Sequence, residues 1–219
     1  MKVISWNLLR QTGATVENIS MLIDRERPDL LLLQEATNDI EALTSLAGGN
    51  IRHMPMPGRI YGLAAWTPGR LEQPTELSLP VSSLPGRLPR RIAQIVQLNG
   101  IAFANIHLSH GQRLNRRQLT YTAASLEGPA AIIGDFNAVG PIFLRGFTDI
   151  GPRRATHRAA NVVPFRLDRC LARGLRCTST GILDRGRSDH CPIVLDLATS
   201  GEECLEAEPV RMMSWYRRR

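Results

Sequence analysis

Alternation of hydrophobic and polar residues marks most of the strands that this chain is expected to form. The clearest segment is 91–109, where two alternating runs flank Asn99 and Gly100, a pair typical of a two-residue hairpin turn. Residues 30–33 are all leucine, a pattern typical of a strand covered on both faces. The segments predicted to contain strands are 2–9, 29–36, 50–55, 61–69, 91–98, 101–109, 130–137, 165–172, 175–183 and 190–198.

Other segments carry apolar residues at helical spacing instead. In the first of them, Val16, Ile19, Leu22 and Ile23 share one face of a helix that Pro28 ends. A second predicted helix begins with an Asn or Asp cap and ends at two glycines. The predicted helices lie within 16–27, 38–49 and 113–128.

Two further segments, the proline-rich 71–89 and 140–164, are predicted loops. Hairpins and strand–helix–strand passages are mixed along the chain, which predicts mixed sheets rather than a purely parallel one. Together with the absence of a GxGxxG motif, this favours two packed sheets with helices outside over a Rossmann fold. Because no linker divides the chain, we expect a single domain over 1–200, followed by a tail over 201–219.

The composition is that of an ordinary globular protein, with 43% hydrophobic and 21% charged residues. No apolar run approaches the roughly 20 residues needed to span a bilayer, and the first residues are too polar for a signal peptide. We therefore expect a cytoplasmic protein without a transmembrane segment. Its cysteines show no zinc-type spacing and are expected to be reduced thiols: Cys170, Cys177, Cys191 and Cys204.

The net charge of +7 and the sequence pI of about 10.0 favour an anionic partner. Lys2 is the only lysine, and arginine binds phosphate in a bidentate fork, although base composition of the genome would produce the same skew. Local arginine clusters are expected at the solvated surface unless they converge in space. They are Arg87, Arg90 and Arg91; Arg113, Arg116 and Arg117; and Arg153, Arg154 and Arg158.

Polar residues stand at the margins of six apolar segments, and this recurrence is the strongest functional signal. In the stretch AAIIGDFNA (130–138), Asp135 and Asn137 are two residues apart and would point the same way from an extended strand. Each such residue alone has an ordinary structural explanation, such as a turn or a solvated strand end. The residues at all six margins are Asn7; Gln34 and Glu35; Asn105 and His107; Asp135 and Asn137; Asp168; and Ser188, Asp189 and His190.

Together these residue types fit metal-assisted phosphate chemistry. A phosphodiester is anionic and repels a nucleophile, so a hard cation such as Mg²⁺ has to neutralise it. One or two carboxylates and a carboxamide suffice as ligands, because Mg²⁺ prefers oxygen and keeps waters. Histidine beside a carboxylate suits proton transfer near neutral pH.

Six motifs occur in the order SWN, LLLQE, NIHLS, IIGDFNA, RLDRCL and RSDHCPIVLDL, from Lys2 to about Leu197. In this order they resemble the endonuclease/exonuclease/phosphatase superfamily, with its pancreatic-deoxyribonuclease-like fold, and suggest a small, bacterial-type member. The resemblance implies an α/β (α+β) fold, a four-layer α/β/β/α sandwich of two mixed sheets with the active site at one end. His107 in its HL motif is similar to deoxyribonucleases and sphingomyelinases rather than to abasic-site endonucleases, which use a nearby tyrosine.

The resemblance also implies roles for individual residues. Glu35 would be the main metal ligand, with Asn7 beside it, and Asp189 a further carboxylate toward the metal or water. His190 would be the general base, or would steady the pentavalent phosphorus, oriented by Asp168. Asp135 would position the attacking water, Asn137 would hydrogen-bond the phosphate, and His107 would contact phosphate or assist the leaving group.

The leading hypothesis is therefore a phosphodiesterase dependent on Mg²⁺, or alternatively Mn²⁺, most simply a nuclease acting on DNA or RNA. The basic charge favours nucleic acid, since cations read backbone phosphates. The alternatives are a phosphodiesterase for phospholipid headgroups, whose basic tail would touch an anionic membrane, and a small-molecule phosphatase. A catalytically inactive binding protein is disfavoured because Glu35, Asp135, Asp168 and His190 are all present.

Four residues near these motifs are given structural interpretations instead. His110 is expected at the surface and Cys191 in core packing. His157 is expected in a loop rather than in the site. Arg91 is expected either at the rim of the active site or as a charge at the edge of a hairpin.

Overall fold

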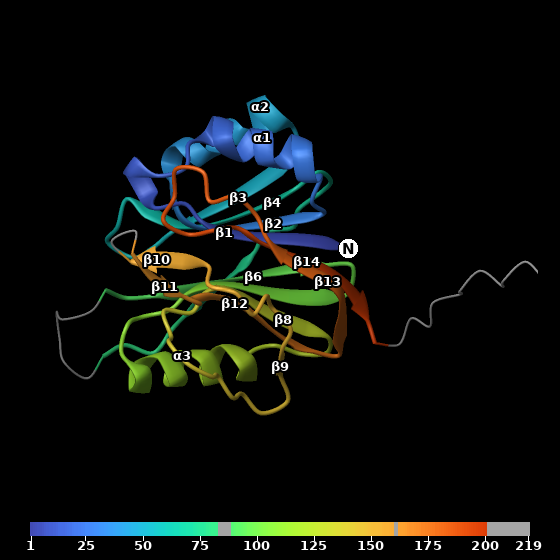
Figure 1. The fold of residues 1–219 in the computed structure, drawn as a ribbon. Coiled ribbons are helices and arrows are strands. Elements are labelled where there is room, and N and C mark those ends of the chain that lie inside the picture. Colours follow the sequence, from blue (N-terminus) through green and yellow to red (C-terminus); the bar gives the residue numbers. More distant parts are fainter. Residues whose placement is uncertain (83–88, 160–161, 201–219) are drawn as a thin grey trace, which may run out of the picture.

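In the computed structural model, which describes residues 1–82, 89–159 and 162–200, two six-stranded sheets lie face to face (Figure 1). In spatial order, the first sheet consists of β13 (Leu175–Ile182), β14 (Ile193–Thr199), β1 (Lys2–Asn7), β2 (Leu30–Thr37), β4 (Tyr61–Thr67) and β3 (Asn50–Pro55). The second consists of β5 (Thr75–Ser78), β6 (Ile92–Leu98), β7 (Ile101–His107), β8 (Ala130–Asp135), β12 (Asp168–Arg173) and β9 (Thr148–Asp149). A separate hairpin pairs β10 (His157–Ala159) with β11 (Val163–Phe165).

Both sheets are mixed, as predicted. Each contains one parallel pair, β1 with β2 and β7 with β8, among antiparallel neighbours. The β6–β7 turn is the predicted hairpin, with Asn99 and Gly100 at φ values of 51° and 73°. A two-residue turn with positive φ at both positions matches the twist of the flanking strands, and Asn and Gly are the residues that adopt it most readily.

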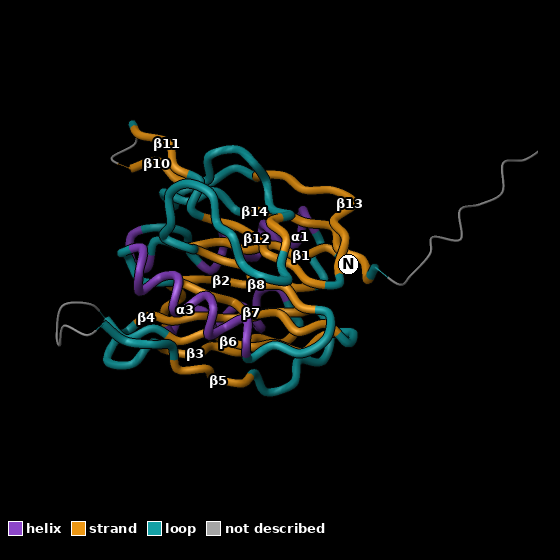
Figure 2. The backbone as a smooth tube through the Cα atoms, turned by 90° about the horizontal axis from the view of Figure 1, so that it is seen from below, coloured by secondary structure: helices purple, strands orange, loops and turns teal. Residues whose placement is uncertain are grey.

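Helices cover the outer faces of both sheets and complete four layers (Figures 1 and 2). On the first sheet lie α1 (Val16–Glu26) and α2 (Leu43–Ala47), with the short 3₁₀ turns η1 (Arg10–Thr12) and η2 (Asn38–Ala42); α3 (Gln112–Ala124) lies on the second. Thr15 and Asn18 form a capping box that starts α1, and Arg27 in the left-handed conformation ends it before Pro28. The predicted helices are thus confirmed, the second as η2 followed by α2.

Three apolar layers hold the sandwich together, and the leucine run of β2 contributes to two of them. Leu30 and Leu32 pack between the sheets, with Phe103 of β7 among their neighbours. Leu31 and Leu33 face outward and pack with the buried side of α1. On the other side, Leu119 of α3 belongs to the layer beneath the second sheet. Both faces of β2 are covered, which is why its sequence does not alternate.

Two predicted loops need correction, and some other predictions fall on residues that the structure does not describe. The segment 71–89 contains β5, which pairs with β6, and 140–164 contains β9, β10 and β11. Short strands of two to four residues carry too little periodicity to be seen in a sequence. The tail 201–219, with Cys204, and Arg87 lie outside the described residues. The described cysteines, Cys170, Cys177 and Cys191, are free thiols.

Within the described part of the chain, no helix combines the length and the apolar character that crossing a membrane would require.

Candidate active site

The carboxyl ends of the two parallel strand pairs lie at one end of the sandwich, and this end carries the candidate site. Asn7 ends β1 beside Gln34 of β2, and His107 ends β7 opposite Asp135 of β8. Asp168 starts β12 opposite Asp135, because β12 is antiparallel to β8. A cavity of about 370 Å³ opens here, and seven of the eight predicted site residues line it: Asn7, Glu35, His107, Asp135, Asn137, Asp189 and His190.

The site converges on the buried carboxylate of Asp135. Its Oδ2 accepts a hydrogen bond from the Asn7 side-chain amide at 3.1 Å, which joins the two sheets at this end. The Nε2 atoms of His107 and His190 lie 3.5 and 3.8 Å from the same oxygen. These contacts fix the carboxylate in one orientation beside the cavity.

Asn137 lines the cavity, but its backbone conformation differs from the extended strand that its spacing predicts. It lies beyond the end of β8 with φ of 46°, so it does not continue the extended strand. Its backbone N–H donates to Asp135 Oδ1 at 2.9 Å, and its side-chain amide donates to the Leu108 carbonyl at 2.9 Å. Asp135 and Asn137 both line the site, but the strand geometry invoked for them is wrong.

His190 is held by the eighth predicted residue, Asp168, which lies behind it. His190 Nδ1 is 2.8 Å from Asp168 Oδ2, and both side chains are buried. The Asp168 backbone N–H donates to Thr156 Oγ1 at 3.0 Å, which fixes the start of β12. The imidazole Nε2 is thereby left facing Asp135 and the cavity.

The charge of His190 is set by competing effects. Burial would lower the pKa of the imidazolium, but the Asp168 carboxylate, with smaller contributions from Asp135 and Asp189, raises this pKa to about 9. The charges of the chain itself therefore favour the imidazolium at neutral pH.

His107 has the opposite electrostatics. Burial lowers its pKa to about 3, even though Asp135 lies nearby and favours the charged form. Its Nδ1 is buried and has no hydrogen-bond partner within the described residues. His107 is thus a neutral imidazole, whose Nε2 faces Asp135.

Glu35 enters the site through a distortion of β2. The pairing of β2 with β4 shifts register between Gln34 and Ala36, and Glu35 has φ of 56°, the left-handed region that non-glycine residues rarely adopt. An extra residue of this kind turns its side chain away from the normal alternation of the strand. Gln34 points into the core while Glu35 lines the cavity.

The Glu35 carboxylate fits a cation. Burial raises its pKa, and Asp135 adds to this while Arg10 and Arg91 oppose it. Among the described residues, none donates a hydrogen bond to this carboxylate. A desolvated carboxylate without a donor, near a second one, is the setting in which a hard divalent cation is bound.

Asp189 immediately precedes His190 in the sequence and contacts a residue that was expected elsewhere. His157 Nε2 is 3.3 Å from Asp189 Oδ2, and the rings of His157 and His190 are 4.4 Å apart. Ligand atoms of these three residues lie within 4.8 Å of one another, close enough to hold a metal ion. The expectation of a loop role for His157 is wrong: it belongs to β10, which bridges to His190.

Two further residues of the cavity could have been found from strand direction. Arg91 immediately precedes β6 and Tyr61 begins β4; both strands are antiparallel to strands that end at the site. The beginning of an antiparallel strand lies at the same edge as the end of its neighbour. Arg91 is buried and lines the cavity, as one of its two interpretations has it; His110 is exposed, as expected, yet lies at the rim.

The remaining polar residues at strand margins serve the structure. Gln34 Nε2 donates to Asn105 Oδ1 at 2.7 Å, and Asn105 donates to the Leu33 and Ala64 carbonyls, so these amides link the sheets beneath the site. Ser188 Oγ donates to the Asn7 carbonyl and accepts the His190 N–H. These residues support the site without lining it.

This fold and this set of strand ends match a known family. The sequence profile of the Endonuclease/Exonuclease/phosphatase family matches residues 4–190. The chain belongs to this family. It is therefore a member of a family of phosphoester hydrolases, which generally use divalent metals, and the predicted four-layer sandwich is confirmed.

Several solved structures share this fold at low sequence identity. A functionally unknown conserved protein from Enterococcus faecalis superposes with a TM-score of 0.76 at 20% identity, covering 91% of this chain and 100% of its own. Humanized D. rerio TDP2 gives 0.70 at 16%, covering 91% and 99%. Mannosyl-6-phosphatase from Bacteroides thetaiotaomicron gives 0.68 at 15%, covering 90% and 99%. No curated protein sequence matches the chain.

Proposed function

We propose that this protein is a divalent-metal-dependent phosphodiesterase, and specifically a nuclease that cleaves DNA or RNA by attack of water on phosphorus. The observation that carries the proposal is the arrangement around Asp135. A fixed carboxylate, a paired imidazolium and a carboxylate without a donor face one cavity. Metal-assisted phosphoryl transfer needs these three kinds of group.

Glu35 would hold the cation, with Asn7 and Asp189 as the further oxygen donors. When bound, Mg²⁺ or Mn²⁺ neutralises the phosphate and stabilises the charge that develops on its oxygens. Asn7 suits a secondary role, because its Oδ1 already accepts the Leu9 N–H at 3.1 Å and keeps a second lone pair.

Asp135 would position the attacking water and accept one of its protons as the new oxygen–phosphorus bond forms. Of its two predicted roles, His190 suits that of steadying the pentavalent phosphorus rather than that of general base, because an imidazolium donates hydrogen bonds and has no free lone pair to accept a proton. Its Nε2–H would hydrogen-bond a phosphoryl oxygen while the bond to the leaving oxygen breaks; that oxygen would depart with the bonding electron pair and take up a proton from solvent. Asp168 is a positioning residue, which orients this ring and favours its charged form.

The neutral His107 and the buried Arg91 would complete the phosphate site. His107 Nε2 is directed at the Asp135 side of the cavity, where it could serve phosphate or the leaving oxygen. Arg91 adds a guanidinium whose pKa burial lowers and neighbouring anionic groups raise. With Arg10 and His190, it favours an anionic substrate in a cavity that already holds carboxylates.

Nucleic acid is the preferred substrate because the chain carries a net charge of +7. A small-molecule phosphatase is the second candidate. It is favoured by the volume of about 370 Å³, which suits a single phosphate ester, and by the mannosyl-6-phosphatase among the structural neighbours. In the lipid-headgroup alternative the membrane contact would come from the tail 201–219, which lies outside the described residues.

A substrate panel separates these possibilities. Purified full-length protein is incubated with supercoiled plasmid, single-stranded DNA, RNA and a sugar phosphate, in Mg²⁺, Mn²⁺ or EDTA. His190→Ala serves as the test for contaminating nucleases, and Arg25→Ala on α1, far from the cavity, as the matched control. The proposal expects metal-dependent cleavage of a polymer by wild type and Arg25→Ala. Release of phosphate from the sugar ester without polymer cleavage would favour the second candidate.

A further inference from the structure

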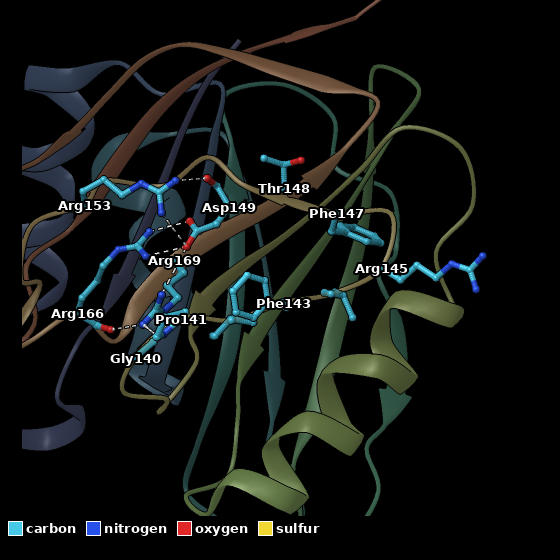
Figure 3. A pocket seen from close by; sticks show the side chains of 12 residues that line it. Gly140, Pro141, Phe143, Arg145, Phe147, Thr148, Asp149, Arg153, Arg166 and Arg169 are labelled. Atoms are coloured by element: carbon cyan, nitrogen blue, oxygen red, sulfur yellow. Dashed lines mark hydrogen bonds and ion pairs between the residues drawn. The ribbon is translucent and has the colours of Figure 1, made fainter.

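A second and larger cavity, of about 810 Å³, adjoins the loop that follows Asn137 (Figure 3). Its walls come from residues 140–149, which continue that loop, and from Arg153, Arg166 and Arg169. We call it the arginine–phenylalanine cavity, after these three arginines and Phe143. None of the roles proposed for the active site uses it.

The two cavities share their structural supports. Arg169 directly follows Asp168 in β12, and its Nη2 donates to the carbonyls of Ala138 at 3.1 Å and Gly140 at 2.8 Å. Gly140 is the third residue after Asn137, so the chain between them spans at most about 11 Å. The arginine–phenylalanine cavity therefore begins within reach of a polymer whose phosphate occupies the active site.

This cavity carries an excess of positive charge. Arg166 binds both oxygens of Asp149 at 2.7 Å, while Arg169 and Arg153 lie 3.4 and 3.7 Å from the same carboxylate. Figure 3 shows the three guanidinium groups gathered around Asp149. One carboxylate cannot neutralise three guanidiniums, and Arg145 also lines the cavity. Burial and then the charge of Arg166 lower the pKa of Arg169, as expected where cations are crowded.

The same cavity carries an aromatic ring that the described residues leave open to solvent. Phe143 is 93% exposed, the largest exposed fraction among the large hydrophobic side chains that the structure describes. Arg153 is also open to solvent, with 75% of its side chain exposed. An aromatic face next to available guanidinium groups is the combination that binds single-stranded nucleic acid, where bases stack and phosphates pair with cations.

We propose that the arginine–phenylalanine cavity binds one unpaired nucleotide of a nucleic acid strand, next to the phosphate held in the active site. Its base stacks on Phe143 and its phosphate pairs with Arg153. A base inside a duplex is covered on both faces by its neighbours, so this site selects single strands, frayed ends or gaps. The inference rests on the proposed nuclease function and deepens it by naming the form of the substrate.

Binding without cleavage tests this directly. Fluorescence anisotropy measures the Kd of full-length protein for a labelled single-stranded oligonucleotide and for the matching duplex, both in EDTA. We expect Phe143→Ala to weaken single-strand binding about tenfold, since stacking on an aromatic ring is worth about 1–3 kcal/mol per base. We expect Arg153→Ala to lower the slope of log K against log salt by about 0.7, the value for one single-strand phosphate. The affinity for the duplex should change less in both variants.

Matched controls lie on α1, in the opposite outer layer. Met21 is 68% exposed and Arg25 has 58% of its side chain exposed, so Met21→Ala and Arg25→Ala remove similar groups away from both cavities and should leave binding unchanged. If wild type binds and cleaves nucleic acid while Phe143→Ala and Arg153→Ala bind like these controls, this inference is wrong and the proposed function stands. If wild type neither binds nor cleaves any nucleic acid, both are wrong. If the two variants lose binding to anionic phospholipid vesicles but not to oligonucleotides, the cavity binds lipid and the inference is also wrong.

Discussion

Replacing Asp168 by asparagine tests the electrostatics of the site most sharply, because it removes one charge and keeps the shape. His190 Nδ1 lies 2.8 Å from Asp168 Oδ2, and the pKa of His190 is about 9 against an ordinary 6.5. This difference corresponds to about 3 kcal/mol of preference for the imidazolium. Without the carboxylate, burial is opposed only by the weaker influence of Asp135 and Asp189. We expect the pKa of His190 in Asp168→Asn to fall to about 6.5 or lower.

The assay is an NMR titration of the histidine ring protons in EDTA, with the His190 signal assigned by its loss in His190→Gln. Stability provides a second readout. A folded-state pKa raised from 6.5 to about 9 contributes stability that is fully present below pH 6.5 and is lost as the pH rises through 9. Urea denaturation should therefore show a larger deficit for Asp168→Asn at pH 6 than at about pH 9.5. A wild-type His190 that titrates near 6.5, or a variant that titrates like wild type, would show that Asp168 does not set the charge of His190.

Other predictions concern the cation, the strand pairing, the buried amides and the arginine cluster. Glu35→Gln should reduce Mn²⁺ affinity, measured by calorimetry, by about 10- to 100-fold or more, and an unchanged affinity would place the cation elsewhere. Gly134 has φ of 139°, and a Cβ there would lie 2.1 Å from the Ile106 carbonyl oxygen. Gly134→Ala should therefore lower the melting temperature markedly. A shift within error would show that β7 and β8 can separate without cost. Asn105→Leu leaves the Gln34 amide without its acceptor, and two strand carbonyls and Gln94 Oε1 without their donor, so the free energy of unfolding in urea should fall by about 1–3 kcal/mol; a more stable variant would contradict this. The pKa of Asp149 is lowered, because its arginine partners outweigh burial. The Asp149 carboxylate therefore contributes stability that is present above pH 3.8 and is lost as the pH falls below it. The loss of unfolding free energy in Asp149→Asn, measured in urea, should shrink at acid pH, and a constant loss would argue against the ion pairs.

The layers of the fold were predictable because burial imposes a pattern on sequence. The Asn-Gly hairpin, the leucine run of β2 and the apolar face of α1 each follow from one dominant local rule. β5, β9, β10 and β11 were missed because strands of two to four residues have no such pattern. Their positions depend on pairing with distant segments, which only the folded chain reveals.

The candidate site was predictable to the extent that strand ends determine it. Residues at the ends of the parallel strands meet by topology, and Asn7, His107 and Asp135 do so. Glu35 reaches the cavity through a bulge that its sequence does not announce. His157 reaches it through a hairpin that bridges to His190, so its position depends on tertiary pairing rather than local pattern.

A position at a strand end does not by itself separate residues that line the cavity from residues that support it. Gln34 and Asn105 stand at strand margins like the site residues, but their amides link the two sheets in the interior. Side chains of successive strand residues alternate between faces, and a one-residue shift at the bulge reverses that alternation. For this reason the sequence identifies which segments reach the site, whereas the structure decides which side chains face the cavity.

Above all, we propose that the Asp135, His190 and Glu35 cluster performs metal-dependent hydrolysis of phosphodiester bonds. The most direct measurement is the initial rate of cleavage of a labelled single-stranded oligonucleotide by wild type and His190→Ala, each in Mg²⁺ and in EDTA. We expect cleavage by wild type in Mg²⁺, none in EDTA, and a rate at least about 100-fold lower in His190→Ala. Cleavage that persists in EDTA, or an undiminished rate in folded His190→Ala, would contradict it.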